Sequence, residues 1–334
     1  MIEAFVANEG VLEVDFEPAS ARNLPTVEGA FGFDRQTTLR QRVHCSGIGL
    51  HSGKQVRMSL VPAPAGTGIR FCRTDLPPQE AWIDARWDRV TDTTLCTVIS
   101  NQHGAFVGTV EHLMAALSAC GLDNAVVELD APEPPAMDGS AAPYMFLIEC
   151  AGIATLPTRR QVLRILKPVR VGEGGKYAAL KPSAYPELDV TIEFPNRLIG
   201  RQRTRIALSG TRFKTDLARA RTFGFADEVD RLRSKGLAQG GSLDNAVVLD
   251  GETVLNPEGL RYPDEFVRHK ALDVIGDLYL AGGPFLGRYV GNMAGHKLNN
   301  LLLRALFADR TAYEWADSLP VVSHADRQLA RAAS

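Results

Sequence analysis

One histidine and two aspartates recur every four residues in the segment from Phe266 to Leu280, FVRHKALDVIGDLYL. Read as a helix, this segment places His269, Asp273 and Asp277 along one line, because side chains four residues apart share a helix face. A solvated polar face with a helical His–Asp pair is the ordinary interpretation of such a pattern. Two aspartates at this spacing repel each other unless a cation compensates, which favours a metal site instead. Histidine and aspartate would supply two zinc ligands, and a third must come from elsewhere in the chain.

The rest of this segment shows how the helix would be held. Its apolar residues follow the i, i+4, i+7, i+8, i+11 spacing of one buried stripe. They are Val267, Ala271, Val274, Ile275 and Leu278. Phe266 and Leu280 also lie near the polar line, which indicates that this line is partly covered as well. The helix is therefore expected to lie inside the protein and to position the polar residues there.

Two further places carry chemically capable residues, although the local pattern leaves their roles open. Glu111 and His112 stand in the first turn of a helix predicted in TVEHLMAALSACGLDN. Thr109 is its expected N-cap, and Gly121 its expected end. An acid at a helix start is usually there for capping alone. His51 lies among glycines in HCSGIGLHSG, which would let the backbone approach a ligand, but a tight hairpin explains the glycines equally well.

Composition places the chain among ordinary globular proteins. Its 334 residues are 45% hydrophobic and 23% charged, with a formal net charge of −2, so there is no basic excess of the kind that nucleic-acid binding requires. The apolar runs are too short to span a bilayer, and the N-terminus lacks a signal peptide. Five scattered cysteines without CxxC spacing predict reduced thiols and a cytoplasmic protein. A monomer is expected, with no nucleic acid and no integral membrane segment.

The chain divides into four predicted parts. Residues 1–36 carry seven acids against two bases and are expected to form an appended extension. Residues 37–158 and 159–312 are predicted as two α+β domains that meet at the polar run LPTRRQ, with a C-terminal tail at 313–334. A weak internal repeat between VGTVEHLMAAL and VGNMAGHKLNNLLLRAL favours two similar halves. A further helix is predicted around Asp216 to Arg221.

Seven motifs in chain order resemble the UDP-3-O-acyl-N-acetylglucosamine deacetylases, the zinc-dependent family of lipid A biosynthesis. They are HCSGIGLHSG, TVEHLMAAL, MDGSAAPYMFL, ARTFGF, GGSLDNAVV, EFVRHKALDVIGDLYLAG and AGHKLNN. The resemblance covers about residues 37–310. It implies two similar two-layer α+β domains, each a sheet on helices, with the active site between them. It also implies an enzyme with one zinc per chain that removes the N-acetyl group from a UDP-linked, 3-O-acylated N-acetylglucosamine and releases acetate.

The resemblance further implies a role for five residues at the reaction centre. The zinc ligands would be His112, His269 and Asp273, so the third ligand would come from the other domain. Three protein ligands leave one position for water, which is the arrangement of catalytic zinc. Glu111 would take the proton of that water as general base. His296 would stabilise the oxyanion and protonate the leaving amine.

The remaining site residues follow from the same resemblance. Asp277 would orient His296 and favour its charged form. The hydroxyl of Thr222 would donate to the oxyanion, although a threonine in a loop is more often a turn residue. Lys270 would reach substrate hydroxyls or phosphate, and its alternative is a solvated lysine. His51 would join the substrate-binding residues.

An inserted segment at about 221–248 would form a passage for the acyl chain. Phe223 and Phe225 would line it, although apolar residues there could equally belong to a local core. Two features depart from the family pattern: the acidic extension is additional, and Ala294 replaces a small polar residue before Gly295. Two other functions stay open, a catalytically silent homologue that binds a sugar nucleotide or lipid, and a deacetylase of a different acylated amino sugar.

Overall fold

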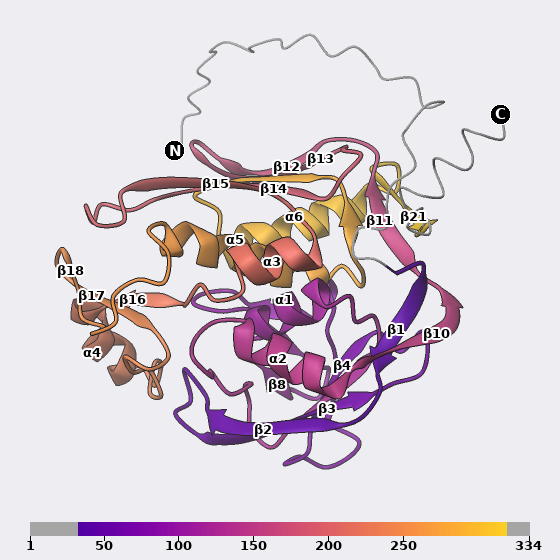
Figure 1. The fold of residues 1–334 in the computed structure, drawn as a ribbon, viewed down its shortest axis with the longest axis horizontal. Helices are drawn as coiled ribbons and strands as arrows, with labels where there is room; N and C mark the ends of the chain where they lie inside the picture. The colour runs from indigo at the N-terminus through magenta and orange to yellow at the C-terminus, as the bar shows by residue number, and fades with distance from the viewer. Residues whose placement is uncertain (1–32, 319–334) are drawn as a thin grey trace, which may run out of the picture.

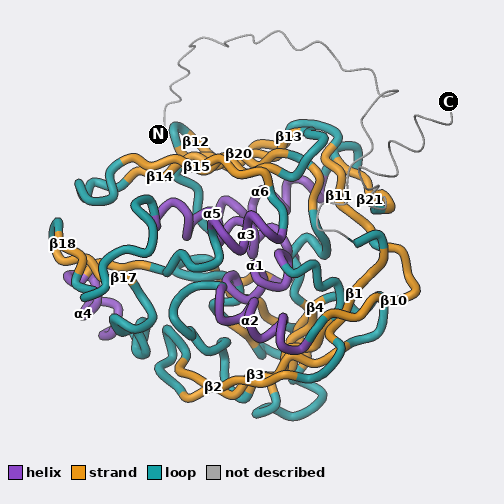
Figure 2. The backbone as a smooth tube through the Cα atoms, in the orientation of Figure 1, coloured by secondary structure: helices purple, strands orange, loops and turns teal. Residues whose placement is uncertain are grey.

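The structure is a computed structural model, which describes residues 33–318. Two five-stranded sheets lie on the outside and helices fill the space between them, as Figures 1 and 2 show. The predicted α+β class is confirmed. The predicted extension at 1–36 lies almost entirely outside the described residues, as does most of the predicted tail. None of the helices in residues 33–318 has the length and apolar character that a bilayer span requires.

The first sheet presents one face to the helices. It consists of β2 (Val43–Ile48), β3 (Gln55–Pro62), β4 (Ile69–Arg73), β5 (Trp82–Asp84) and β9 (Ala125–Leu129). The spatial order is β2–β3–β9–β4–β5, in which only β4 and β9 run parallel. In β3 the buried side chains Val56, Met58 and Leu60 alternate with more exposed ones, because one sheet face packs on the core. The helices α1 (Glu111–Ala119) and α2 (Ala142–Ala151) cover that face (Figure 1).

The second sheet repeats the first strand for strand. It consists of β12 (Val169–Glu173), β13 (Lys176–Lys181), β14 (Glu187–Glu193), β15 (Arg201–Ala207) and β20 (Arg288–Asn292). The order β12–β13–β20–β14–β15 again contains one parallel pair, β14 with β20. The helices α5 (Glu265–Tyr279) and α6 (His296–Ala308) flank β20 in the chain as α1 and α2 flank β9. Two similar halves were predicted, but the repeat was wrongly aligned, because α6 corresponds by topology to α2 rather than to α1.

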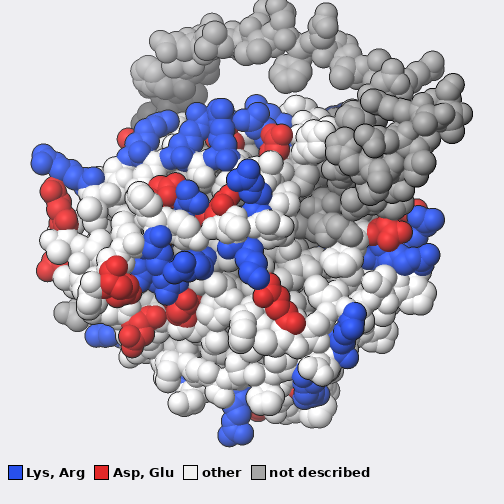
Figure 3. Space-filling model, in the orientation of Figure 1, with Lys and Arg blue, Asp and Glu red and all other residues white. Residues whose placement is uncertain are grey.

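Arginines cover the outer face of this second sheet, where Figure 3 shows Lys and Arg gathered. Arg203 and Arg205 alternate with more buried residues along β15, and both reach the carboxylate of Asp189 on the neighbouring strand. Arg288 from β20 donates to the same carboxylate at 3.0 Å. Asp189 is buried, and the hydrogen bonds from Arg203 help to lower its pKa to about 2. This cluster links the three strands β14, β15 and β20.

Smaller elements connect and decorate the two halves. They are the strands β1 (Arg35–Leu39), β6 (Val90–Asp92), β7 (Val98–Ser100), β8 (Phe106–Val107), β10 (Ile153–Arg159), β11 (Gln161–Ile165), β19 (Phe285–Leu286) and β21 (Tyr313–Asp317), the helix α3 (Gly210–Asp216) and a 3-10 turn at Trp87–Arg89. The insert contains β16 (Phe223–Phe225), α4 (Ala226–Ser234), β17 (Val247–Asp250) and β18 (Thr253–Val254). It therefore continues past the predicted limit of 248.

Three local predictions are wrong for identifiable reasons. The range predicted as a tail begins with a strand, because β21 pairs with β11. The helix expected around residues 216–221 lies earlier in the chain and ends at Asp216. It starts at Gly210, because Ser209 caps it by accepting from the N–H of Arg212. Thr109 does not cap α1, since Val110 is the N-cap and Thr109 has φ of 52°.

Helix α5 is buried on both of its faces. Its predicted apolar stripe is almost fully buried, from Val267 at 0% exposure to Leu278 at 2%. The polar line is buried as well, with His269 at 1% and both Asp273 and Asp277 at 3%. Buried polar groups are costly unless they find partners, so this face needs complementary groups from the neighbouring elements. Helix α1 brings His112 to Asp273, and helix α6 brings His296 and Asn299 to Asp277.

A glycine allows α1 and α5 to approach each other closely. Gly276 lies on α5 at the contact, and a Cβ atom built on it would stand 1.9 Å from the carbonyl oxygen of Glu111. Because that oxygen belongs to the helix backbone, no side-chain rotation relieves the clash. Gly276 therefore sets the spacing of the two helices that carry the predicted site residues.

We expect Gly276→Ala to destabilise the protein. Helix propensity alone favours alanine over glycine by about 0.5–1 kcal/mol, whereas overpacking a close contact costs about 1–3 kcal/mol. The clash with Glu111 should win, so the free energy of unfolding in urea should fall. Gly224→Ala is the matched control, because an added Cβ there meets nothing within 4 Å. A Gly276→Ala variant as stable as the parent protein would contradict this account of the helix contact.

Candidate metal centre and active site

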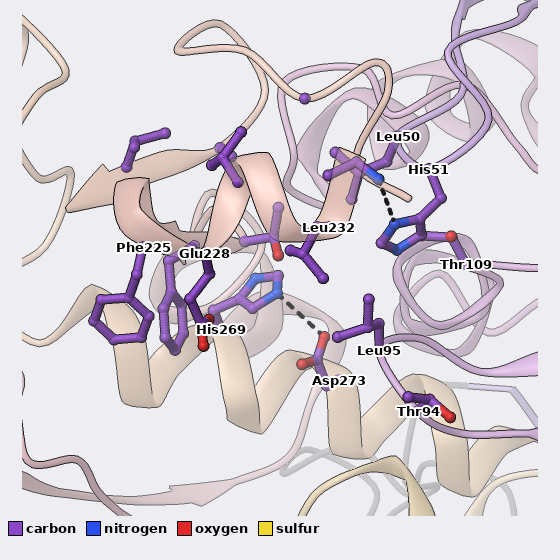
Figure 4. Close-up of a pocket in the computed structure, with 18 of the residues that line it drawn as sticks. Leu50, His51, Thr94, Leu95, Thr109, Phe225, Glu228, Leu232, His269 and Asp273 are labelled. Carbon is purple, nitrogen blue, oxygen red and sulfur yellow. Dashed lines mark hydrogen bonds and ion pairs between the residues drawn. The ribbon is translucent and has the colours of Figure 1, made fainter. Parts of the chain in front are cut away.

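Three predicted ligands meet where α1 packs on α5. His112 comes from α1, whereas His269 and Asp273 come from α5, and one ligand atom of each lies within 4.8 Å of the others. The Nε2 atoms of His112 and His269 stand 3.5 and 3.3 Å from Oδ1 of Asp273. Figure 4 shows the second of these contacts at the wall of a cavity. The helix pairing thus joins a residue of the first half to two residues of the second.

The donor atoms in this cluster fit a metal ion. Nδ1 of His269 lies 3.1 Å from the carbonyl oxygen of Ala220 and must donate to it, because a carbonyl only accepts. Burial lowers the pKa of His269 to about 3, although Asp273 raises it, so the ring is neutral and Nε2 carries a lone pair. That lone pair faces Oδ1 of Asp273, a buried oxygen that accepts no hydrogen bond within residues 33–318. The lone pairs of Nε2 and Oδ1 repel each other unless a cation lies between them. The cluster can therefore bind a metal ion.

Glu111 stands beside this cluster at the start of α1. Its side chain is only 3% exposed, and its Oε2 accepts a hydrogen bond from the backbone N–H of Thr97 at 3.0 Å. The other carboxylate oxygen, Oε1, lies 3.8 Å from Nε2 of His296. Burial raises the pKa of Glu111, although His296 and His112 lower it. A carboxylate with a raised pKa is a better proton acceptor than an exposed one.

His296 begins α6 and is held by Asp277. Its Nδ1 lies 2.9 Å from Oδ2 of Asp277, which also accepts from Asn299 at 2.8 Å. The other oxygen of Asp277 accepts from the hydroxyl of Thr97 at 2.6 Å. Burial disfavours the charged ring, but the carboxylates of Asp277 and Glu111 outweigh it and raise the pKa of His296 to about 9. His296 is therefore protonated at neutral pH, with Nε2–H directed toward Glu111.

Thr97 is a site residue that the sequence analysis missed. It is 2% exposed and contacts both carboxylates, Glu111 through its backbone and Asp277 through its hydroxyl. Nothing in TTLCTVIS distinguishes it from any other strand residue. Asn299 was also missed, but a signal existed for it. It follows His296 by three residues, a spacing that places both on one face of α6.

A cavity of about 620 Å³ extends from the cluster to the insert (Figure 4). Its lining includes all the predicted site residues except Asp277: His51, Glu111, His112, Thr222, Phe223, Phe225, His269, Lys270, Asp273 and His296. The wall on the side of the insert is mainly apolar, with Val229, Leu232 and Val248 among its residues. One end of the cavity therefore carries the acid, base and metal-binding groups, and the other end suits a hydrocarbon chain.

The residues predicted to bind substrate differ in how they are held. Nζ of Lys270 donates to Oδ2 of Asp273 at 2.9 Å and lies 5.5 Å above the ring of Phe223. It is thus not the solvated lysine of the alternative interpretation. His51 accepts at Nδ1 from the backbone N–H of Ala238, 3.3 Å away, and so links the first half to the insert. Thr222 lies in the cavity wall, held through its backbone N–H by Gly139 at 2.9 Å.

The two phenylalanines of the insert belong both to the cavity wall and to a local core. Phe223 packs edge-on against Phe266 and Phe194, with ring centroids 5.0 and 5.6 Å apart. The ring of Phe225 lies 6.2 Å from that of Phe194. Both phenylalanines are half-buried and line the cavity as well. The two interpretations of these residues are therefore compatible.

We expect a divalent cation to stabilise the folded chain. A ligand that binds only the folded state adds about 2.7 kcal/mol to the free energy of unfolding at 100 times its Kd. Thermal unfolding with zinc, and then with excess chelator, should show this difference. His112→Ala should respond little, because one ligand is gone, whereas His103→Ala should respond like the parent protein, since His103 is exposed and outside the cluster. Equal melting temperatures with and without chelator in the parent protein would contradict the metal centre.

Comparisons with known proteins agree with the resemblance in the motifs. The family model for LpxC, UDP-3-O-acyl N-acetylglycosamine deacetylase, matches residues 36–308. Proteins named UDP-3-O-acyl-N-acetylglucosamine deacetylase from Shewanella oneidensis, Shewanella sp. strain ANA-3 and Shewanella baltica strain OS155 are each 48% identical over 281 residues. The matches cover 84% of this chain and 92% of each relative. The predicted resemblance is confirmed, and this chain belongs to the UDP-3-O-acyl-N-acetylglucosamine deacetylase family.

Proposed function

We propose that this protein is a zinc-dependent hydrolase that removes the N-acetyl group from UDP-3-O-(3-hydroxyacyl)-N-acetylglucosamine and releases acetate in lipid A biosynthesis. The observation that carries the proposal is the buried cluster of His112, His269 and Asp273 beside the pair Glu111 and His296, at one end of a cavity with an apolar far end. The names of the curated relatives support the same substrate.

The ligand set favours zinc. Two imidazole nitrogens and one carboxylate oxygen are ligands that zinc accepts, and three protein ligands leave a position open for catalysis. When bound, zinc would polarise the amide carbonyl and lower the pKa of a coordinated water. His112, His269 and Asp273 would hold it. The hydrogen bond from Nδ1 of His269 to Ala220 supports this role, because it leaves Nε2 free to coordinate.

Glu111 acts as the general base in this proposal. Its Oε2 is occupied by the N–H of Thr97, so Oε1 is the oxygen left to accept a proton. The carboxylate lies in the cavity wall beside His112, where the attacking water would bind. The raised pKa makes Glu111 a stronger base. It would accept the proton of that water as the water oxygen bonds to the acetyl carbon.

His296 acts as the electrophilic partner and proton donor. Asp277 binds its Nδ1–H, so Nε2–H points into the cavity. The charged ring would stabilise the oxyanion that forms on the acetyl carbonyl, and the hydroxyl of Thr222 in the same wall would be a second donor. Cleavage of the C–N bond leaves an amine that takes a proton from His296, so that acetate and a free amino sugar are released.

The apolar end of the cavity supports a site for the 3-O-acyl chain. Phe223 and Phe225 lead from the cluster to the insert, where Val229 and Leu232 continue the apolar wall. Each buried CH₂ group would contribute about 0.8 kcal/mol to binding. Lys270 and His51 would contact the sugar or its phosphates; Lys270 can do so because Asp273 engages only one of its donors.

We expect acetate release from the UDP-linked 3-O-acylated substrate to depend on metal and on the acyl chain. Treatment with chelator should abolish the activity, and added zinc should restore it. Glu111→Gln should lower kcat by at least about 100-fold, the usual contribution of a general base. A substrate without the acyl chain should show a lower kcat/KM.

Each alternative function gives a different result in this assay. A silent homologue would bind the substrate without releasing acetate, whatever metal is supplied. A deacetylase of a different acylated amino sugar would release acetate from the UDP-linked substrate only slowly, even with metal supplied. His103→Ala serves as the control, because His103 lies outside the cavity lining and should leave both the metal dependence and the rate unchanged.

We expect kcat/KM to be bell-shaped in pH, because Glu111 must be ionised and His296 protonated. The pKa of His296 is raised to about 9, so activity should be retained at neutral pH and lost as pH rises through about 9. The acid limb should lie above the ordinary carboxyl range, because burial raises the pKa of Glu111. The two limbs belong to a coupled system and are best fitted together.

Substitution separates the two limbs. His296→Ala should lower the rate strongly and remove the alkaline limb while metal binding persists, since His296 is not among the ligands. Asp277→Asn should move the alkaline limb to lower pH, because the main group that raises the pKa of His296 is neutralised. An alkaline limb that is unchanged in His296→Ala would assign the proton donor to another group.

A further inference from the structure

We propose that Glu265 is a positioning residue for the metal ligand His269 and acts on it through the peptide bond between Ala220 and Arg221. The inference rests on the proposed metal centre and gives a role to a residue that begins the motif EFVRHKALDVIGDLYLAG but is not in the cavity lining. Glu265 is completely buried in the first turn of α5, one turn before His269. Residues four apart share a helix face, so both side chains point toward the segment that contains Ala220 and Arg221.

The peptide bond between Ala220 and Arg221 is held at both of its ends. Its carbonyl oxygen accepts from Nδ1 of His269 at 3.1 Å, and its N–H donates to Oε1 of Glu265 at 2.9 Å. A continuous chain of hydrogen bonds therefore runs from the carboxylate through one peptide group to the imidazole. Nε2 of His269, at the far side of the ring, faces the proposed metal position.

The side chain of Glu265 accepts every hydrogen bond that it makes within residues 33–318. It accepts from the backbone N–H of Arg221, from Nε of the same residue at 2.9 Å and from Nη2 at 3.2 Å. A fourth donor is the backbone N–H of Arg261 at 2.6 Å. Within residues 33–318 these four donors thus occupy both oxygens of the carboxyl group. The guanidinium of Arg221, itself 1% exposed, supplies the compensating charge.

The physical effect on His269 has two parts. A negative charge on the N–H side of a peptide draws its proton and increases the electron density on the carbonyl oxygen, because hydrogen bonds in series strengthen one another. A stronger acceptor at Ala220 holds Nδ1–H more firmly, which fixes the tautomer and ring plane and makes Nε2 a better donor to a metal. A neutral side chain in place of Glu265 would weaken both effects without touching the metal.

A purely structural role for this ion pair predicts something else. Buried ion pairs are weak evidence for stability, and their removal often changes folding alone. If Glu265 only secures the loop before β16, its loss should lower the melting temperature and leave the affinity for metal as it was. Metal affinity of the folded chain therefore distinguishes the two roles.

The test is the zinc Kd of the full chain and of its Glu265→Gln variant, measured by competition with a chelator. Glutamine keeps the size of the side chain but removes the charge. We expect the Kd to rise about 10- to 100-fold, the usual cost of losing an outer-shell partner. The visible spectrum of the Co²⁺-loaded variant should shift as well, since the ligand field of His269 changes. Glu265→Asp is a second variant. Its shorter side chain keeps the negative charge but moves it away from the peptide N–H, so the zinc Kd should rise in this variant as well.

Asp189→Asn is the matched control. Asp189 is likewise a buried carboxylate bound by arginines in the second half, but it has no contact with a proposed ligand. Its substitution should lower stability and leave the Kd and the Co²⁺ spectrum unchanged. A Kd in folded Glu265→Gln and Glu265→Asp within twofold of the parent value, with an unchanged spectrum, would overturn the inference. Absence of metal binding by the parent chain would overturn the proposed centre and this inference together.

Discussion

The direct contact between α1 and α5 is the constraint on which the rest of the site depends. The two helices can meet only because Gly276 offers no side chain to the carbonyl oxygen of Glu111. Their contact brings His112 to Asp273, and it also places Glu111 opposite His296, whose partner Asp277 lies one turn beyond Asp273. A wider spacing would separate Glu111 from His296 and would also separate His112 from Asp273.

This contact also concentrates charge among buried side chains. Glu111, Asp273 and Asp277 are all at 3% exposure, and burial of three carboxylates so close together is unfavourable unless cations are present. The structure supplies His296 and Lys270 as cations, and Oδ1 of Asp273 is still left without a hydrogen bond within residues 33–318. The deficit of positive charge is therefore located at the atom that faces both imidazoles. The i, i+4 aspartates therefore do have cations beside them: Lys270 of the same helix contacts Asp273, and His296 of α6 contacts Asp277.

The sequence could predict those parts of the site that repeat along a helix. The line from His269 to Asp277 and the apolar stripe of α5 follow from spacing alone, and so does the expectation that the polar line is covered. His112 and Glu111 needed the family resemblance, because two adjacent residues in a first helical turn look like capping. Neither route gave a role to Thr97 or Glu265, although Glu265 begins one of the motifs. Thr97 binds Glu111 through its backbone N–H and Asp277, 180 residues away, through its hydroxyl, and Glu265 binds a peptide N–H of another segment.

The two halves have the same strand order and directions, so α1 and α5 occupy equivalent places and pack on each other across the interface between them. A symmetric pair of helices would offer the same residues from both sides. Here the groups are divided instead: α1 contributes the proposed base and one proposed ligand from its first turn, and α5 contributes two proposed ligands from its middle. The second half also differs from the first in the segment before β16. This segment passes beside α5, and its Ala220 accepts a hydrogen bond from His269. The insert, which begins just after this segment, adds Phe223 with its ring centroid 6.3 Å from that of His269. The interface between two similar halves thereby becomes an asymmetric site, in which the proposed base comes from α1 and the proposed proton donor from α6.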